Sequence, residues 1–146
     1  GLRHEDIGST GENEVSIVKR NNVNGARVKS SERVINVSKD LIKIYNEYLI
    51  NEYPNVDSDY VFVNVWSGSI GLPMNHKSID ELFKQLKKRT GIHAYPHLLR
   101  HTHATELIKG GIDIHIVSKR LGHKSISTTI NTYTHLTAQD LQIVIN

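Results

Sequence analysis

The apolar positions of the chain form short β-rich runs near its start and helical stripes over most of the rest. The segments 14–20 (EVSIVKR) and 32–37 (ERVINV) are short and rich in β-branched residues, which predicts two strands. Asn24-Gly25 lies between them, and this dipeptide favours a turn. We therefore expect an antiparallel hairpin with a long loop, and Lys29 lies in that loop.

Helical spacing dominates after the hairpin. Ser38 is a suitable N-cap, and apolar residues between Leu41 and Leu49 recur at helical spacing until Pro54, so we expect a core helix there. A brief strand or extended connector is expected at 60–64. Further helices are expected at 78–89, from Pro96 to Gly110, at 113–122, at 125–136, and from Thr137 onward. The pattern predicts an α+β, mostly helical fold with a small antiparallel β-sheet near the N-terminus followed by a helical bundle, as one domain over residues 1–146.

Composition narrows the class of protein. The chain has 146 residues, enough for one ordinary domain, and lacks the run of about 18 apolar residues that a membrane span needs. It has no cysteine, which excludes disulfides and thiolate metal sites, and its first ten residues contain no apolar signal region. We expect a protein of the cytoplasm without membrane contact.

Charge is unevenly distributed along the chain. Residues 72–146 carry ten Lys and Arg against five Asp and Glu, whereas residues 1–71 carry eight against ten. Seven of the nine histidines also fall between His93 and His135. This asymmetry favours a polyanionic partner, although ordinary solvated lysines would produce the same count.

The stretch 95–111, YPHLLRHTHATELIKGG, contains several histidines and an arginine that could bind a ligand. His97 and Arg100 share a face in the first turn of a predicted helix, where the helix N-terminus favours an anion, so they suit a phosphate. His97 and His101 have metal-ligand spacing, but no third ligand lies at a supporting position and Arg100 would repel a cation. Taken singly, His101 and His103 also fit histidines that hydrogen-bond within the fold.

Three motifs occur in a fixed order: HLLRHTHAT, then LGH, then TYTHL. In this order and with these gaps they closely resemble the catalytic domain of tyrosine recombinases, the phage-integrase family. The resemblance extends over essentially the whole chain. It implies that fold, double-stranded DNA as partner, and a role in integration or transposition of a mobile element.

The resemblance also implies roles for individual residues. Tyr133 matches the nucleophile that forms a 3′-phosphotyrosyl bond, and Arg100 matches an arginine that binds the non-bridging phosphate oxygens. His97 and His123 match the positions that assist proton transfer, and Lys29 matches a loop lysine that protonates the leaving 5′-oxygen. No metal and no cofactor are implied. The loop offers other cations for the last role, namely Lys19, Arg20 and Arg27.

The physical chemistry of the reaction agrees with these roles. A tyrosine with an ordinary pKa of about 10 is a poor nucleophile at neutral pH, so the site must supply both a proton acceptor and positive charge. The covalent link retains the energy of the broken phosphodiester, so a second DNA hydroxyl can reverse the attack and exchange strands. Three other functions stay open: a noncatalytic DNA-binding remnant, type IB topoisomerase-like relaxation, and a metal-dependent hydrolase.

One departure from the family pattern concerns Arg3. In the family a first catalytic arginine follows Gly-Leu and precedes an Asp-Ile by about eleven positions, but here Asp6-Ile7 comes only three positions after Arg3. We therefore expect the first arginine upstream of residue 1, together with a separate DNA-binding domain. The resemblance further implies a homo-oligomer, a tetramer on DNA, formed through the C-terminal helix with Leu141, Val144 and Ile145 on one side.

Overall fold

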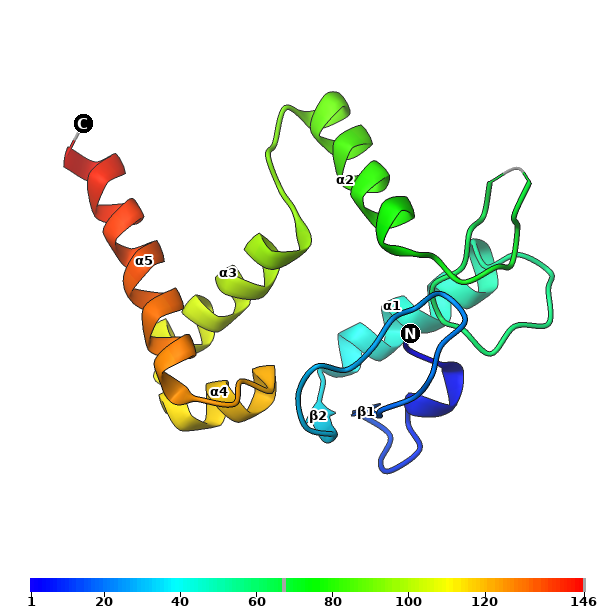
Figure 1. Ribbon diagram of the computed structural model, residues 1–146, viewed down its shortest axis with the longest axis horizontal. Coiled ribbons are helices and arrows are strands. Elements are labelled where there is room, and N and C mark those ends of the chain that lie inside the picture. Colours follow the sequence, from blue (N-terminus) through cyan, green and yellow to red (C-terminus); the bar gives the residue numbers. More distant parts are fainter. Residues whose placement is uncertain (67, 146) are drawn as a thin grey trace. The chain divides into compact units, whose positions relative to one another are not determined.

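The computed structural model describes residues 1–66 and 68–145, with the backbone alone at residues 136, 137 and 139–145. Figure 1 shows short strands near the N-terminus and helices over the remainder, so the predicted α+β, mostly helical class is confirmed. The elements in chain order are η1 (His4–Asp6), β1 (Glu14–Ile17), β2 (Arg33–Asn36), α1 (Lys39–Asn51), α2 (His76–Thr90), α3 (Pro96–Lys109), α4 (Ile114–Leu121) and α5 (Ile126–Ile145).

The two strands form the predicted antiparallel hairpin. Glu14 pairs with Asn36 and Ile17 pairs with Arg33, so the strands are shorter than the β-rich segments and leave a long loop between them. The segment 60–64, expected as a brief strand or an extended connector, is an extended connector in which Tyr60 forms an isolated bridge with Arg3. This bridge holds the start of the chain against the connector.

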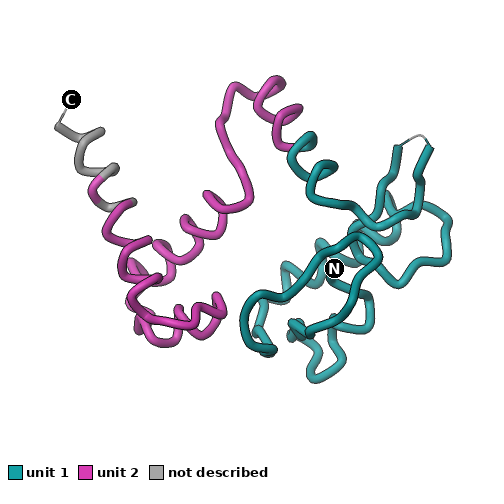
Figure 2. The backbone as a smooth tube through the Cα atoms, viewed as in Figure 1, with its two compact units in different colours: residues 1–82 teal, residues 83–146 magenta. Residues whose placement is uncertain are grey.

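The chain divides into two compact units, residues 1–82 and residues 83–146 (Figure 2). The first unit contains the hairpin, α1 and the beginning of α2. The second contains α3, α4 and α5. Lys29 therefore lies in the first unit, whereas the other four predicted site residues lie in the second.

The helix α1 begins where the sequence predicted, because the Ser38 hydroxyl accepts a hydrogen bond from the Leu41 N–H at 3.2 Å. No residue of α1 is buried, and Ile44 is 60% exposed, so the prediction of a core helix was wrong. The apolar stripe lines an open hollow of the first unit together with Val61 instead. Helical spacing identified the stripe but could not show what covers it.

In the second unit α3, α4 and α5 contact one another around a small core. Ala104, Val117 and Leu121 form this core, and each is less than a tenth exposed. Gly122 ends α4 in the left-handed conformation at φ +71°, which a glycine adopts without steric cost. This turn redirects the chain into α5.

The prediction of two helices after residue 125 was wrong, because α5 continues without a break from Ile126 to Ile145. The segment contains no glycine or proline to stop the helix, and a threonine such as Thr137 can occupy an interior position. The predicted docking side chains Leu141, Val144 and Ile145 lie outside the described side chains. Within the described part of the chain, no helix is both long and apolar enough to cross a membrane.

Candidate functional site

Four of the five predicted site residues lie on the framework of α3, α4 and α5. His97 and Arg100 lie in the first turn of α3, which begins with Pro96 as predicted. His123 follows the glycine that ends α4, and Tyr133 lies in α5. Because these three helices contact one another, the second unit supplies one continuous support for all four side chains.

Arg100 is half-buried, and a hydrogen bond joins its side chain to the end of α4. One terminal N–H of its guanidinium donates a hydrogen bond to the backbone carbonyl of Leu121, the last residue of α4. A cation is favoured there because the carboxyl end of a helix carries partial negative charge. Among the residues that the structure describes, no carboxylate pairs with Arg100. The guanidinium therefore keeps donors that suit the oxygens of an anion.

The ring of His123 is held by a contact from α5. Its backbone N–H donates to the Ser118 carbonyl at 3.0 Å, and ring atom Nδ1 lies 2.7 Å from the hydroxyl oxygen of Thr129. Thr129 is fully buried, at 0% exposure. This contact occupies Nδ1 and orients the ring. The sequence analysis missed Thr129, because no motif marks a threonine six residues after a histidine.

Tyr133 lies four residues after Thr129 on α5, so the two residues share a face of that helix. The phenol is half-buried. The face that holds the His123 ring therefore also carries the predicted nucleophile one helical turn further along.

His97 and His101 stack on α3 with ring centroids 6.3 Å apart. Burial lowers the pKa of His101, and the nearby positive charges of His97, Arg100 and His135 lower it further. His135 on α5 therefore lies near enough to α3 to act on His101, and the permanent charge of Arg100 beside it disfavours a metal cation. In the described parts of the chain no three His, Asp or Glu side chains are grouped to hold a metal ion.

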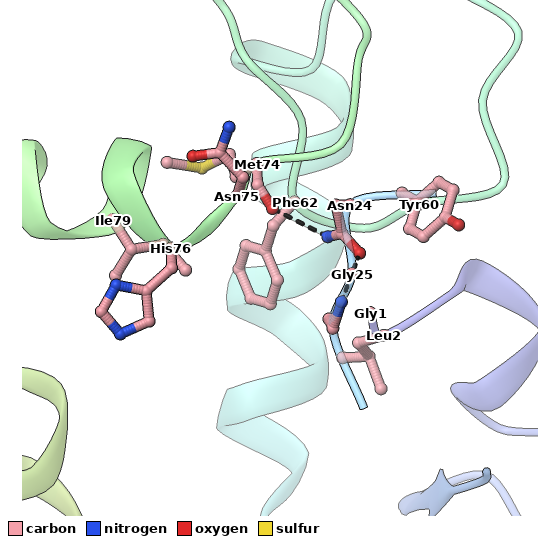
Figure 3. A pocket seen from close by; sticks show the side chains of 11 residues that line it. Gly1, Leu2, Asn24, Gly25, Tyr60, Phe62, Met74, Asn75, His76 and Ile79 are labelled. Carbon is pink, nitrogen blue, oxygen red and sulfur yellow. Dashed lines mark hydrogen bonds between the residues drawn. The ribbon is translucent and has the colours of Figure 1, made fainter. Parts of the chain in front are cut away.

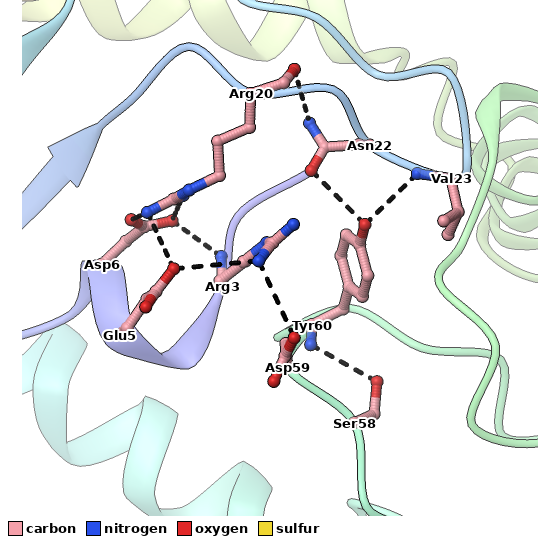
Figure 4. Close-up of polar contacts among 9 residues, drawn as sticks. All are labelled: Arg3, Glu5, Asp6, Arg20, Asn22, Val23, Ser58, Asp59 and Tyr60. Atoms are coloured by element: carbon pink, nitrogen blue, oxygen red, sulfur yellow. Dashed lines mark hydrogen bonds and ion pairs between the residues drawn. The ribbon is translucent and has the colours of Figure 1, made fainter.

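Lys29 is exposed in the long loop of the first unit. Arg20, an alternative for the same role, is engaged by Asp6 through two hydrogen bonds of 2.8 and 2.7 Å (Figure 4). Among the described residues Lys29 pairs with no carboxylate. Of these two cations, Lys29 is the one that an outside group could use.

Arg3 is also engaged within the first unit. Its guanidinium lies 3.7 Å from the Asp59 carboxylate and 5.4 Å from the centre of the Tyr60 ring (Figure 4). These contacts hold the guanidinium against the connector, and its buried Nε atom has no hydrogen-bond partner among the described residues. They support the expectation that Arg3 does not bind the reacting phosphate.

A sequence profile described as the phage integrase family matches residues 1–140. The chain belongs to the phage integrase family. Transposase A from transposon Tn554 of Staphylococcus aureus is 46% identical over 144 residues, which cover 97% of this chain and 40% of the transposase. The chain thus spans about 40% of the length of this relative.

Solved structures agree with this assignment. The crystal structure of XerA recombinase matches with a TM-score of 0.73 and 28% identity, over 98% of this chain and 48% of that one. The Tn1549 transposon integrase, solved in complex with circular intermediate DNA, shares the fold with a TM-score of 0.68 and 22% identity, over 91% of this chain and 48% of that one. The resemblance to a tyrosine recombinase catalytic domain is therefore confirmed.

Proposed function

We propose that this chain is the catalytic region of a longer enzyme that cleaves and rejoins DNA at specific sites when a mobile element integrates or transposes. The observation that carries the proposal is the arrangement of Arg100, His123 and Tyr133 on one helical framework. Arg100 is anchored without a carboxylate partner among the described residues, and His123 is held by the face of α5 that carries Tyr133. Membership of the phage integrase family supports the same reaction.

The proposed reaction begins when the phenol oxygen of Tyr133 attacks a DNA phosphorus atom. A bond from that oxygen to phosphorus forms, and the bond from phosphorus to the 5′-oxygen breaks, which leaves a 3′-phosphotyrosyl link and a free 5′-hydroxyl. Arg100 binds the non-bridging oxygens and stabilises the charge that develops on them. His97 and His123 hydrogen-bond the phosphate and assist removal of the phenol proton, and Lys29 donates a proton to the leaving oxygen.

Strand exchange follows from the chemistry of the intermediate. The phosphotyrosyl link is itself a phosphodiester, so little energy is lost when it replaces the DNA bond. A 5′-hydroxyl from a second DNA strand can therefore attack it and restore a phosphodiester without ATP or metal. Hydrolysis would need water in place of that hydroxyl, and it would end the exchange.

The proposal also covers the DNA substrate and parts of the enzyme outside residues 1–146. Double-stranded DNA is the proposed substrate, held by this region and by an upstream DNA-binding domain. The first catalytic arginine is proposed to lie upstream of residue 1, since Arg3 is engaged by Asp59 and Tyr60. A tetramer on DNA, joined through the C-terminal helix, and a cytoplasmic location complete the proposal.

The test compares residues 1–146 with a form extended upstream by about 20 residues, enough for the helix in which we place the first arginine. Each receives a duplex that is nicked beside the cleavage site, so that the released fragment diffuses away and the protein stays attached. The extended form should give a covalent adduct on a denaturing gel. The shorter form should give a hundredfold to thousandfold less, on the order expected for loss of one preorganised donor. Equal yields would place the first arginine within residues 1–146, and no adduct from either would contradict the proposed function.

A further inference from the structure

Hydrogen bonds hold both ends of the loop that carries Lys29. At its start, the guanidinium of Arg20 makes two hydrogen bonds to the carboxylate of Asp6, which is only 2% exposed (Figure 4). The N–H of Lys19 donates to the Glu32 carboxylate at 2.7 Å, which joins the start of the loop to its end. Lys29 therefore lies on a loop whose ends are fixed.

The middle of the loop is a closed turn. The Gly25 N–H donates to the Asn22 carbonyl at 2.9 Å, and the Asn22 side-chain amide donates to the Ala26 carbonyl at 2.8 Å. The Asn24 side-chain oxygen accepts from the Ala26 N–H at 3.1 Å. Gly25 permits this geometry because its φ is +73°. Residues 22–26 thus form one internally bonded turn.

This turn is docked on two separate parts of the first unit. The side-chain amide of Asn24 donates a hydrogen bond to the backbone carbonyl of Met74 at 2.8 Å, beside an open hollow (Figure 3). The Tyr60 hydroxyl accepts from the Val23 N–H at 3.3 Å and lies 3.4 Å from the Asn22 side-chain oxygen (Figure 4). The side chains of Asn22 and Asn24 both close the turn, and each also docks it, Asn22 on Tyr60 and Asn24, through the shorter hydrogen bond, on Met74.

Lys29 comes three residues after the turn ends at Ala26. On its other side, Ser30 accepts a hydrogen bond from the Arg33 guanidinium at 3.1 Å. The span between these fixed points, residues 27–29, is short, so the place of the turn limits where the backbone of Lys29 can lie. A shift of about 1 Å in a catalytic group can slow a reaction a hundredfold.

We propose that Asn24 is a positioning residue, which docks the loop on the Met74 carbonyl and thereby presents the Lys29 ammonium to the leaving 5′-oxygen. This inference rests on the proposed function, because it needs Lys29 as the proton donor. It adds a residue that lies outside the three recombinase motifs. Asn24 acts through Lys29 and does not itself touch DNA.

The substitution Asn24→Asp separates docking from closure of the turn. A carboxylate keeps the acceptor for the Ala26 N–H but has no donor for the Met74 carbonyl, and its charge repels that carbonyl oxygen. Asn21→Asp is a matched control, since Asn21 lies exposed in the same loop, and no contact of its side chain occurs among the described residues. Both variants change the charge of the loop equally, so any general effect on DNA binding is shared.

The experiment measures cleavage by the upstream-extended protein on two nicked duplexes. One has the ordinary 5′-oxygen at the scissile phosphate, and the other has sulfur in its place, which leaves as a thiolate without a proton. Asn24→Asp should slow cleavage of the oxygen substrate about tenfold to a hundredfold, and it should cleave the sulfur substrate at nearly the rate of the unaltered protein. Lys29→Ala should show the same pattern more strongly, and Asn21→Asp should change neither rate.

Three results would overturn the inference. Equal rates for Asn24→Asp and Asn21→Asp on the oxygen substrate would show that docking does not position the acid. Slow cleavage of both substrates would show that Asn24 supports the fold as a whole. If the unaltered protein forms no adduct with either substrate, the proposed function is wrong, and the inference fails with it. The activity of the unaltered protein therefore distinguishes failure of the proposed function from failure of the inference alone.

Discussion

The ring atom Nδ1 of His123 lies 2.7 Å from the hydroxyl oxygen of Thr129, a side chain with no exposed surface. The contact joins the turn after α4 to the first part of α5. It orients the imidazole through Nδ1, as partners of catalytic histidines commonly do. The proposed mechanism needs this orientation, because His123 must reach a phosphate oxygen or the phenol of Tyr133.

Thr129→Val should slow formation of the covalent adduct about tenfold, less than the roughly hundredfold or more that a general acid–base group itself contributes, because His123 is still present. Valine keeps the shape of the buried side chain but cannot hold the His123 ring, and loss of the hydrogen bond should lower the free energy of unfolding by about 1 kcal/mol. Single-turnover cleavage by the upstream-extended protein measures the effect. Thr132→Val is the control, because among the described residues the Thr132 hydroxyl bonds only to the Thr128 carbonyl of its own helix. Equal rates for the two variants would contradict a role for Thr129 in the site.

Asp6→Asn should lower the free energy of unfolding at pH 7 by about 2 kcal/mol, since it removes the buried charge from two hydrogen bonds to the Arg20 guanidinium, which then keeps the exposed Glu5 carboxylate at 2.9 Å. Asp59→Asn is the control. The Asp59 side chain is 77% exposed and lies 3.7 Å from Arg3, so its loss should cost under about 1 kcal/mol. Urea unfolding of the chain measures both. Similar losses would show that the Asp6–Arg20 pair does not hold the loop.

The stability that Asp6 contributes should depend on pH. Burial opposes ionisation of this carboxyl, but hydrogen bonds from Arg20 and from the Arg3 N–H outweigh it, so the pKa of Asp6 lies below its ordinary value. A carboxyl with a depressed pKa stabilises the fold fully above its unfolded pKa of about 3.9 and loses that contribution as the pH falls toward the folded value. Unfolding curves of the chain and of Asp6→Asn should therefore converge below about pH 4. A constant gap down to pH 2.5, roughly a unit and a half below that pKa, would contradict this.

Mild acid should destabilise the second unit through half-buried His101 and, more weakly because that residue is exposed, through His103. Burial lowers the pKa of both rings; neighbouring positive charges add to this for His101, and Arg120 adds to it for His103. The unfolded chain therefore takes up protons first as the pH falls through about 6.5, and stability decreases until the folded pKa values are reached. The double variant His101→Gln, His103→Gln should lose less stability between pH 7.5 and 5.5 than the unaltered chain. Thermal unfolding measures this, with exposed His115→Gln as control.

The sequence predicted those features that depend on neighbouring residues. Ser38 and Pro96 begin helices as their local chemistry requires, and Gly122 ends one in the left-handed conformation. The hairpin followed from two β-rich runs and a turn dipeptide. His97 and Arg100 were predicted in the first turn of one helix, and they lie there in α3.

Features that depend on distant contacts could not be predicted in this way. Nothing local shows that Thr129 holds His123, or that Asn24 reaches the carbonyl of Met74, fifty residues away along the chain. The engagement of Arg20 by Asp6 likewise required the folded loop. Long-range packing also left the apolar side of α1 open, where its spacing suggested a core.

The central claim is that Tyr133 is the nucleophile, and the identity of the residue attached to DNA tests it most directly. The upstream-extended protein is trapped on a nicked duplex, digested with a protease, and the peptide that carries the nucleotide is sequenced by mass spectrometry. The account predicts that the nucleotide is attached through its 3′-phosphate to Tyr133. It also predicts that Tyr133→Phe forms no adduct, while its affinity for DNA changes by only a few-fold because one hydroxyl is lost. An adduct on any other residue, or an adduct that survives in Tyr133→Phe, would contradict the account.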